Sequence, residues 1–367
     1  MAIDQFTNEF TTTLNGAIDN STQSLTLTSA TGSGINAAPS APFRIRIEDE
    51  IILVGARSGT SCTSCTRGAD GTSAASHADT TAIRHILTRR SLEQLADPRT
   101  CTGRLTLETG VAVSTSDQTA KTTVYFTPYF GARVSLHDGT GWTLYTFSEL
   151  SLALGSITSA KNYDIWLYNN SGTLTLQLSS AWTSDSARAD AITTQDGIYV
   201  KSGDTTRRYL GTIRTTSTTT TEDSLAKRYV WNANVENRVE RPLYLLEGTS
   251  HTYTSTTYRY WQNSSANIVS FVVGIIDKPV FLNGSFGSFA SSASVGATNA
   301  LSLNWTSGTP SATTSVVTQV NGGNFILRGC SAWKHPSLGY NYIAALEQSS
   351  AATSTFSNVT INSLVLA

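Results

Sequence analysis

Residues 43–85 combine short apolar segments with tight turns, and this pattern restricts the region to a small β-sheet module. Residues 43–47 read Phe-Arg-Ile-Arg-Ile, and alternation with period two is typical of a half-buried strand. The Asp70-Gly71 pair predicts a tight turn with positive φ. Four segments have the character of strands: residues 43–47, 51–54, 62–67 and 82–85. Nothing in this region has the character of an active site.

The composition extends the β prediction to the whole chain. Ser and Thr make up about 28% of the 367 residues, whereas charged residues make up only 14%. Thr-rich, charge-poor segments are unfavourable for helices and suit pleated, half-exposed surfaces. The 39% hydrophobic content, with seven Trp and fourteen Tyr, is too high for a disordered chain. We therefore expect a folded, all-β protein.

The length allows two or three domains, each with a core of its own. We expect a small N-terminal β module with a short helix, followed by β-sandwich or barrel domains, with the jelly roll as one form of the last. The expected domains are residues 1–99, 100–225 and 226–367. Strands at spacings of about ten residues, separated by turn signals, indicate a sandwich or barrel.

Local signals predict two helices, two hairpins and a linker. Residues 88–96 predict a helix, because Thr88 can cap it and Asp97-Pro98 ends it, with Leu87 and Leu92 placed as a hydrophobic staple. The remaining predictions are a short helix at residues 147–154, a hairpin turn at Asp138-Gly139, a hairpin over residues 163–178 and a Thr-rich linker at residues 215–221.

Cys62 and Cys65 form a C-x-x-C motif, which in other contexts serves zinc or redox chemistry. A zinc site normally needs four ligands, and no second pair with ligand spacing is present. A redox C-x-x-C opens a helix after a strand, whereas this one lies in a Thr-rich strand and turn. We expect small structural side chains here, and no metal or cofactor.

Two groups of residues are candidates for binding. The first is a basic cluster that could dock an acidic partner, or could be a solvated or internally paired face: Arg84, Arg89, Arg90 and Arg99, with Arg104 counted beside them. The second is an aromatic group that could stack on sugars, or could pack in a core or between subunits: Tyr253, Tyr258, Tyr260 and Trp261. We favour the structural alternative for both groups.

No catalytic residues are predicted. Glycoside hydrolysis needs two carboxylates across a cleft, whereas the acidic residues of this chain are scattered beside turns or on polar faces. No P-loop, G-x-S-x-G or H-E-x-x-H motif occurs. The net charge of −1 argues against nucleic-acid binding, and no apolar run is long enough for a membrane span.

The chain resembles structural proteins of tailed-bacteriophage virions. In the N-terminal module the resemblance lies in Asp49-Glu50-Ile51, Arg67-Gly68, Gly71-Thr72 and His77. Further segments carry it to about residue 260: residues 125–129, Arg133 with residues 138–140, residues 162–164, 168–172, 196–197, 208–212 and 227–232.

The resemblance implies a non-enzymatic virion component that forms homotrimers and contacts other virion proteins, with a host surface glycan as a further partner. A tail fibre or baseplate-attached fibre is the first expectation, a capsid decoration or head-fibre protein is the alternative, and a carbohydrate-cleaving tail enzyme comes third. Residues 1–99 would attach to the particle. Residues 1–9 lack the features of an export signal, so we expect synthesis in the host cytoplasm and a final location in the virion.

Overall fold

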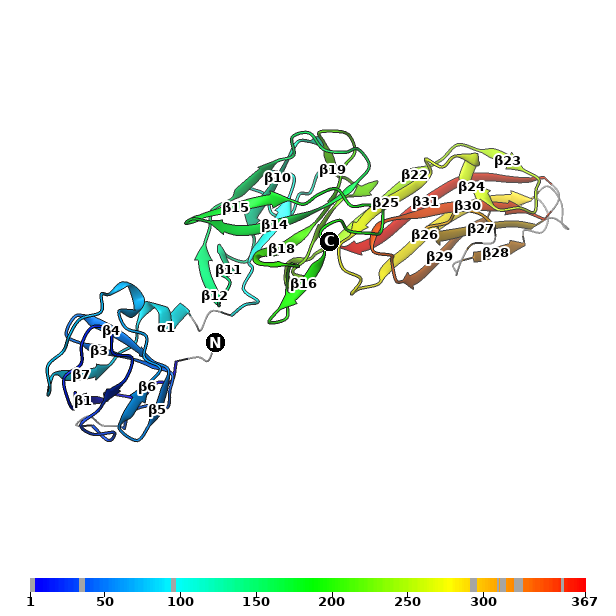
Figure 1. The fold of residues 1–367 in the computed structure, drawn as a ribbon. Coiled ribbons are helices and arrows are strands. Elements are labelled where there is room, and N and C mark those ends of the chain that lie inside the picture. The colour runs from blue at the N-terminus through cyan, green and yellow to red at the C-terminus, as the bar shows by residue number, and fades with distance from the viewer. Residues whose placement is uncertain are drawn as a thin grey trace. The chain divides into compact units, whose positions relative to one another are not determined.

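The fold is almost entirely β, as the composition predicted (Figure 1). The computed structural model describes residues 4–32, 37–93, 97–290, 296–308, 310, 315–319, 326–350 and 353–367. The chain forms two compact units, which are Met1–Thr100 with His137–Leu144, and Cys101–Leu136 with Tyr145–Ala367. Each unit is described by itself below.

The first unit is built on a four-stranded antiparallel sheet in the order β1-β7-β3-β4. Its strands are β1 (Thr11–Thr13), β7 (Ala82–His85), β3 (Phe43–Ile47) and β4 (Glu50–Val54). A smaller sheet has the order β2-β6-β5, with β2 (Leu25–Thr26), β6 (Ser61–Thr63) and β5 (Ala56–Ser58). Ile45, Ile47 and Ile52 are fully buried in the core, which confirms the alternation seen in the sequence.

Two local predictions for this unit can be compared with the structure. Asp70 and Gly71, within the 3-10 turn η1 (Ala69–Gly71), have φ values of 54° and 86°, so the predicted positive-φ turn is confirmed. Helix α1 (Arg89–Glu93) begins after Thr88, whose hydroxyl accepts a hydrogen bond from the Ser91 amide at 3.2 Å. Residues 94–96 of the predicted helix lie outside the described residues.

The expected staple of α1 is wrong. Leu87 and Leu92 are 57% and 55% exposed, so they do not pack into a buried contact at the start of the helix. The capping hydrogen bond of Thr88 is therefore the local interaction that starts the helix.

The first part of the second unit holds three sheets. One has the order β13-β10-β8, with β13 (Leu150–Ala153), β10 (Thr123–Pro128) and β8 (Gly103–Thr106). A hairpin joins β11 (Arg133–His137) to β12 (Trp142–Thr146), and its tip, His137–Leu144, is grouped with the first unit. The third has the order β15-β14-β18-β17-β16, with β15 (Thr173–Leu178), β14 (Asn162–Asn170), β18 (Asp204–Arg214), β17 (Ile198–Lys201), β16 (Ile192–Gln195), and β21 (Val230–Asn232) paired to β18.

Both predicted hairpins are present. β14 and β15 pair in register up to Asn170 opposite Thr173, and the turn residues Ser171 and Gly172 have φ values of 50° and 98°. In the β11–β12 turn Asp138 accepts hydrogen bonds from the amides of Thr140 and Gly141 at 2.8 and 2.9 Å. Positive φ and an Asx side chain are therefore what close these turns.

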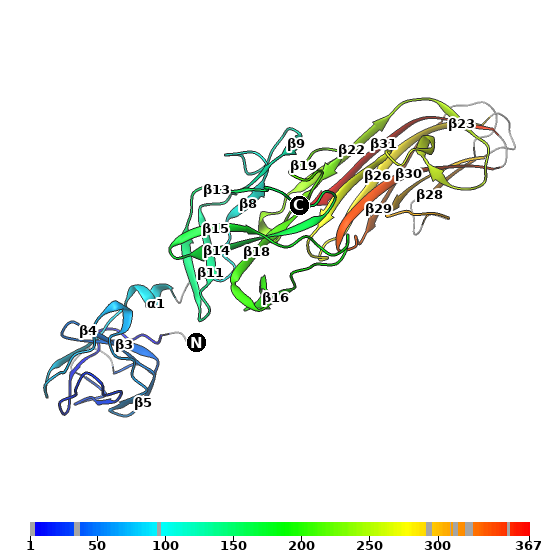
Figure 2. The same ribbon diagram turned by 45° about the horizontal axis from the view of Figure 1, so that its top comes forward.

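Two further sheets face each other in the rest of the unit (Figure 2). One has the order β22-β31-β26-β29, with β22 (Glu240–Glu247), β31 (Ser354–Leu366), β26 (Val280–Ala290), β29 (Ile326–Lys334), and β23 (His251–Tyr253) paired to β31. The other has the order β28-β27-β30-β25-β20-β19-β9, with β28 (Ser315–Gln319), β27 (Gly296–Leu303), β30 (Gly339–Ser349), β25 (Ile268–Val273), β20 (Lys227–Arg228), β19 (Thr221–Asp223), β9 (Gln118–Lys121), and β24 (Arg259–Tyr260) paired to β30. The 3-10 turns are η2 (Val235–Asn237) and η3 (Trp261–Asn263).

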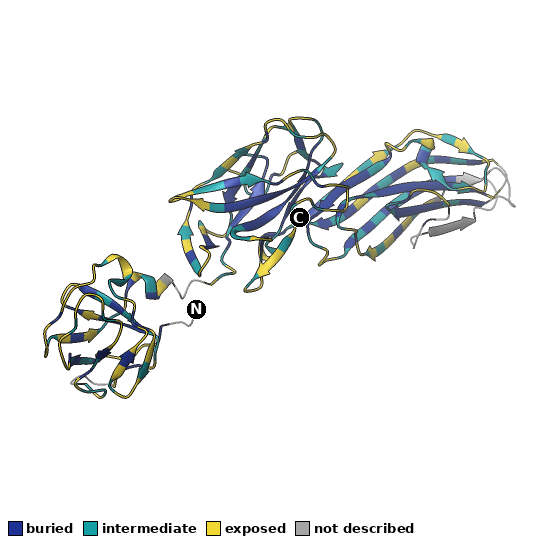
Figure 3. Cartoon of the chain, in the orientation of Figure 1, coloured by how far each residue is buried: buried dark blue, intermediate teal, exposed yellow. Residues whose placement is uncertain are grey.

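A core lies between these two sheets, because one cluster of buried side chains draws on both. Phe286 and Phe356 come from the first sheet, and Phe271 and Ile343 come from the second; all four are fully buried. Figure 3 shows long buried stretches along these strands. This arrangement is a β-sandwich.

Two local predictions for the second unit are wrong. The expected helix at residues 147–154 is strand β13, where half-buried Leu150 and Leu152 alternate with exposed Ser151 and Ala153. Their period is two, which suits a strand and not a helix. The expected linker at residues 215–221 is a tight turn inside the unit, since Thr215 and Thr221 are buried and bridge to each other.

The expected boundary between residues 225 and 226 falls inside the second unit. It lies between β19 and β20, which pair with each other, and β20 also pairs in parallel with β25. The sandwich core also contains Trp166 and Tyr209 from the first part of the unit. The chain therefore forms two compact units where three domains were expected.

This organisation predicts how fragments behave. The first unit's core uses residues from Phe10 to Ile83, so a fragment of residues 1–100 should fold and give dispersed amide signals in a heteronuclear NMR spectrum. A fragment of residues 101–225 loses the strands that complete its sheets and should remain unfolded. Cooperative urea unfolding of the 101–225 fragment would contradict the two-unit description.

Candidate functional site

The carboxylate of Glu50, at the start of β4, is the centre of a buried polar network in the first unit. Glu50 is 1% exposed. Arg67 donates two parallel hydrogen bonds to it, from Nε to Oε1 and from Nη2 to Oε2, both at 2.8 Å. Such bidentate pairs are the strongest and most specific ion pairs in proteins.

Three further groups complete what we call the Glu50 network, which consists of Glu50, Arg67, Gly68, Ala75 and His77. The amides of Gly68 and Ala75 donate to Glu50 at 2.8 and 3.1 Å. Nε2 of His77 lies 2.7 Å from Oε2 of Glu50. The buried carboxylate is therefore surrounded by hydrogen-bonding groups from one continuous loop.

The same loop is tied to its surroundings through Arg67 and Thr72. Arg67 Nη1 donates to the carbonyls of Asp19 and Thr22 at 2.6 and 2.9 Å. The Thr72 hydroxyl accepts from the Ile51 amide at 3.0 Å. Most of the residues quoted for the resemblance in this module thus meet in one place: Glu50, Ile51, Arg67, Gly68, Thr72 and His77.

These contacts also fix the charge of the network. Burial alone would raise the pKa of Glu50, but hydrogen bonds from Arg67, His77 and the two amides outweigh it and lower the pKa from 4.5 to about 2. Glu50 is therefore ionised over the physiological range. Its partners are held by Glu50, by backbone groups and, at Nδ1 of His77, by the Glu48 carboxylate at 2.8 Å, so the geometry suits structural support.

The predicted basic cluster contains both exposed arginines and arginines that form ion pairs within the chain. Arg84 is exposed on β7, and Arg89 is exposed at the start of α1. Arg90 forms an ion pair with Asp138 at 3.4 Å, and Arg99 forms one with Asp97 at 2.9 Å. Arg90 and Arg99 are thus internally paired, as the structural alternative expects.

Arg104 does not belong with this surface. It lies in β8 of the second unit, is 4% exposed, and donates from Nη1 to the carbonyl of Asn237. Sequence proximity placed it with the other arginines, whereas the sheet turns its side chain inward.

The predicted aromatic group packs against other side chains and does not form a solvent-exposed stacking surface. Trp261 is fully buried and contacts Phe286 and Phe356 with ring centroids 5.8 and 5.6 Å apart. Tyr258 and Tyr260 are half-buried and pack on a small core cluster that includes Trp305.

Hydrogen bonds hold the tyrosine hydroxyls of this group. The Tyr260 hydroxyl donates to the carbonyl of Trp305 at 3.1 Å, and that of Tyr253 donates to the carbonyl of Thr257 at 2.7 Å. Arg259 lies over the Tyr253 ring, with Cζ 3.8 Å from the centroid. A sugar would find no free ring face on Trp261, so the packing alternative fits this group.

The C-x-x-C residues are buried free thiols. Burial raises the pKa of Cys62 to about 12 and that of Cys65 to about 11. A redox or metal-binding cysteine needs the opposite shift, because the thiolate is the reactive form. In the part of the chain that the structure describes, no three His, Cys, Asp or Glu side chains lie close enough to hold a metal ion.

The carboxylates considered for glycoside hydrolysis are engaged in local structure. Glu149 accepts hydrogen bonds from the hydroxyls of Thr109 and Thr127, each at 2.6 Å. Glu222 pairs with Lys227 at 3.0 Å. The residues concerned, Glu149, Asp164, Asp196, Glu222, Asp223 and Glu247, do not form a facing pair in any described pocket.

Sequence reasoning missed the buried network around Asp164 in β14. Asp164 is fully buried and accepts from Arg188 Nε at 2.9 Å and from Trp182 Nε1 at 3.1 Å. Burial raises the pKa of Asp164, and Arg188 opposes that shift. An acidic residue inside the apolar run of residues 163–168 was the available signal.

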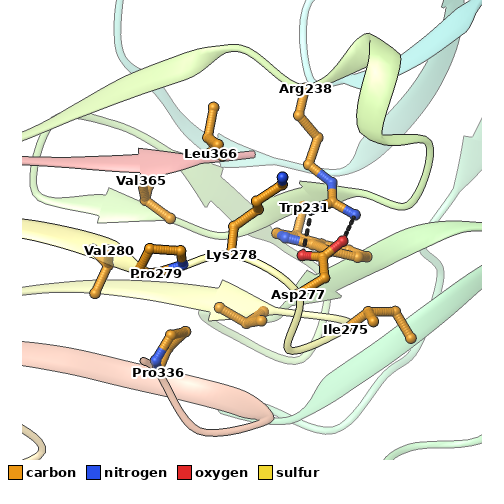
Figure 4. A pocket seen from close by; sticks show the side chains of 11 residues that line it. Trp231, Arg238, Ile275, Asp277, Lys278, Pro279, Val280, Pro336, Val365 and Leu366 are labelled. Atoms are coloured by element: carbon orange, nitrogen blue, oxygen red, sulfur yellow. Dashed lines mark hydrogen bonds and ion pairs between the residues drawn. The ribbon is translucent and has the colours of Figure 1, made fainter. Parts of the chain in front are cut away.

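A small pocket next to Trp231 shows the same structural use of charge (Figure 4). Arg238 forms two hydrogen bonds to Asp277, at 2.7 and 2.8 Å, and its guanidinium lies 4.2 Å from the Trp231 ring centroid. The cavity volume is about 10 Å³. It is large enough for about one water molecule, and far too small for a sugar.

Comparison with known proteins identifies no family. No protein-family model matches the sequence, and no curated protein does. Among solved structures, latent PorU from Porphyromonas gingivalis is 9% identical with a TM-score of 0.24, over 57% of this chain and 24% of that one. A chain in the structure of infectious bursal disease virus, Gx strain, is 11% identical with a TM-score of 0.24, over 75% of this chain and 79% of that one.

The insecticidal delta-endotoxin Cry8Ea1 from Bacillus thuringiensis is 8% identical with a TM-score of 0.20, over 100% of this chain and 54% of that one. The chain thus spans less than two thirds of PorU and of Cry8Ea1. TM-scores of this size support no particular fold family or function. Among the described helices, none has the length and hydrophobicity to cross a membrane.

The Glu50 network predicts a specific loss of stability. Glu50→Gln removes the charge that Arg67 faces, and breaking a buried ion pair costs about 3 kcal/mol. Asp49→Asn is the matched control, because the neighbouring Asp49 side chain is fully exposed and the change should leave stability unaltered. Hydrogen exchange of the β3 and β4 amides in the full-length protein measures the stability of the first unit in each of the two variants. Equal protection in the two variants would contradict the structural role.

The pH dependence follows from the same contacts. The folded pKa of Glu50, about 2, lies below its ordinary value of 4.5. Its contribution to stability is therefore complete above about pH 4.5 and is lost as the pH falls towards 2. Hydrogen exchange of the natural protein should show this loss of stability as the pH falls. In Glu50→Gln the protection of the same amides should depend less on pH.

Proposed function

We propose that this chain is a non-enzymatic structural protein of a tailed-phage virion, with a tail fibre or baseplate-attached fibre as the first assignment. The observation that carries the proposal is the Glu50 network. Several of the residues by which the N-terminal module resembles phage virion proteins lie in this buried network, including Glu50, Arg67 and His77. A resemblance located in fold-determining residues supports a shared module more strongly than one spread over a surface.

The structure supports a non-enzymatic role through the use of its polar residues. Buried charges such as Asp164 and Glu50 are held by arginines and backbone amides. The thiols of Cys62 and Cys65 have raised pKa values, which suppress nucleophilic chemistry. The pattern suits a protein whose task is to hold a shape.

In this proposal the first unit attaches the chain to the particle, through a face that includes the exposed residues Arg84 and Arg89. An acidic neighbouring virion protein is the partner of matching charge. The second unit would make the outward contacts. Loss of the Glu50 network would disorder the attachment module while leaving the second unit folded.

Particle incorporation tests this assignment. A fusion of residues 1–100 to a fluorescent protein, expressed during phage growth, should co-purify with virions, whereas residues 101–367 alone should not. The same fusion carrying Glu50→Gln should co-purify with virions in a smaller amount, and the fusion carrying Asp49→Asn should co-purify in the normal amount. Incorporation of residues 101–367 without the first unit would overturn the proposed polarity.

We also propose self-association as a homotrimer, with contacts partly on the outer face of the β22-β31-β26-β29 sheet. Tyr244 and Leu246 of β22 are 39% and 60% exposed, and Leu327 and Trp333 of β29 are 64% and 63% exposed. Small polar or apolar residues lie between them on β31 and β26. Among the described side chains of this face, Glu240 at one end is the only charged one.

The dimensions of this face fit part of an interface. Four strands spaced about 4.8 Å apart, over about seven residues each, cover on the order of 400–500 Å². A stable interface buries about 800 Å² on each partner, so the face would supply about half of it. An uncharged face also suits contact between identical copies, because no like charges meet.

Charge substitutions test the trimer. Leu246→Asp and Trp333→Asp each place a negative charge in the proposed interface, where it would be buried and would face the like charge of another copy. The mass measured by multi-angle light scattering should therefore shift from three times 39.2 kDa towards 39.2 kDa. Ile276→Asp is the matched control, because Ile276 is 49% exposed but lies outside these strands. A natural protein that is monomeric at micromolar concentration would contradict the proposal.

A further inference from the structure

Three arginines are buried together at one end of the sandwich in the second unit. Arg104 lies in β8, Arg228 in β20 and Arg241 in β22. They are only 4%, 4% and 6% exposed. Buried charges are normally balanced by charges of opposite sign, because an unpaired buried ion is costly.

The carboxylates available to these arginines are too few. Asp223 pairs with Arg228 at 3.3 Å and with Arg241 at 3.1 Å, and it is the only acidic side chain among the described residues that forms an ion pair with any of the three. Arg104 instead donates to the carbonyl of Asn237. At ion-pairing distance the three arginines therefore share one carboxylate, that of half-buried Asp223.

The remaining contacts do not remove this imbalance. Arg228 Nε donates to the carbonyl of Pro242 at 2.9 Å, and Arg241 Nη1 donates to that of Ser114 at 2.8 Å. The buried Nε of Arg241 has no hydrogen-bond partner. Burial, together with the nearby Arg241, lowers the pKa of Arg104 to about 10. The cluster is short of an acceptor.

A pocket is lined by two of these three arginines, Arg228 and Arg241. It has a volume of about 510 Å³ and is lined by Arg228, Arg241, Leu225, Pro242 and the segment of residues 113–117. Pockets of this size are typical of small-molecule sites. Its walls offer the side chains of Ser114, Thr115 and Ser116 beside the two arginines.

We propose that this pocket binds a small oxyanion, a phosphate or carboxylate group, through Arg228 and Arg241. Guanidinium groups pair with these anions in a planar, two-point geometry. The anion would supply the negative charge that Asp223 alone does not provide. The site is independent of the virion assignment, because it rests on contacts within the second unit.

The exposed side chain of Asp117, on the pocket wall, lowers the affinity of this site for an anion. Its carboxylate accepts from the Leu225 amide at 2.8 Å and lies close enough to act on the charge of Arg228. It therefore repels an incoming anion while holding the wall in place. Asp117→Asn keeps the acceptor oxygen and removes the charge, so it should tighten anion binding severalfold.

Binding to the full-length protein tests the site. Isothermal titration with sodium phosphate and with sodium glucuronate, at ionic strength held constant with sodium chloride, separates the two sources of oxyanion, and glucose is the neutral control. We expect saturable binding of at least one anion, weakened at least tenfold in Arg241→Gln. Arg99→Gln, which changes an exposed arginine of the first unit, should bind like the natural protein.

A second variant covers the case in which Arg241→Gln unfolds. Thr115 is an exposed wall residue, so Thr115→Trp should fill the pocket without disturbing the core and should abolish binding. Binding of phosphate alone identifies a free inorganic anion, and preference for glucuronate identifies a carboxylate ligand. The proposal fails if neither anion binds beyond chloride, or if Thr115→Trp and Asp117→Asn bind like the natural protein.

Discussion

The bidentate pair between Glu50 and Arg67 is the interaction on which the first unit depends. A carboxylate that is 1% exposed must have its charge and its lone pairs satisfied by the protein. Arg67, His77 and two loop amides do so, and Arg67 reaches on to the carbonyls of Asp19 and Thr22. Loss of a few kcal/mol here would remove a large part of the stability of a unit of this size. The network therefore holds the loop of residues 67–77 against β4.

The second unit uses the same kind of contact several times. Asp164 is held by Arg188, Glu347 accepts from Arg259 at 2.6 Å, and Asp277 pairs with Arg238. A chain with only 14% charged residues thus places many of them inside. Where the charges balance, the cluster has a structural role. The arginines around Asp223 do not balance, and this imbalance is what distinguishes a candidate binding site from a structural one.

Composition was enough to predict the all-β class, and alternation with turn residues was enough to predict the strands at residues 43–47 and 51–54 and both hairpins, since these depend on local sequence. The errors have physical causes. Residues 147–154 seemed helical, but pairing of β13 with β10 decides their conformation. The 225–226 boundary failed to anticipate the pairing of β18 with β21, which adds residues 230–232 to the sheet of the preceding segment. Arg104 and Arg241 meet through tertiary structure alone, and no local pattern marks such a contact.

The assignment to a virion depends on a resemblance that the Glu50 network makes physically coherent. Immunogold electron microscopy of phage particles, with an antibody against the second unit, tests the assignment most directly. Gold at the tail or baseplate is the predicted result. Gold on the head would replace the tail assignment with the decoration or head-fibre alternative. Particles without any label, from lysates in which the antibody detects the chain free in solution, would contradict a structural role in the virion.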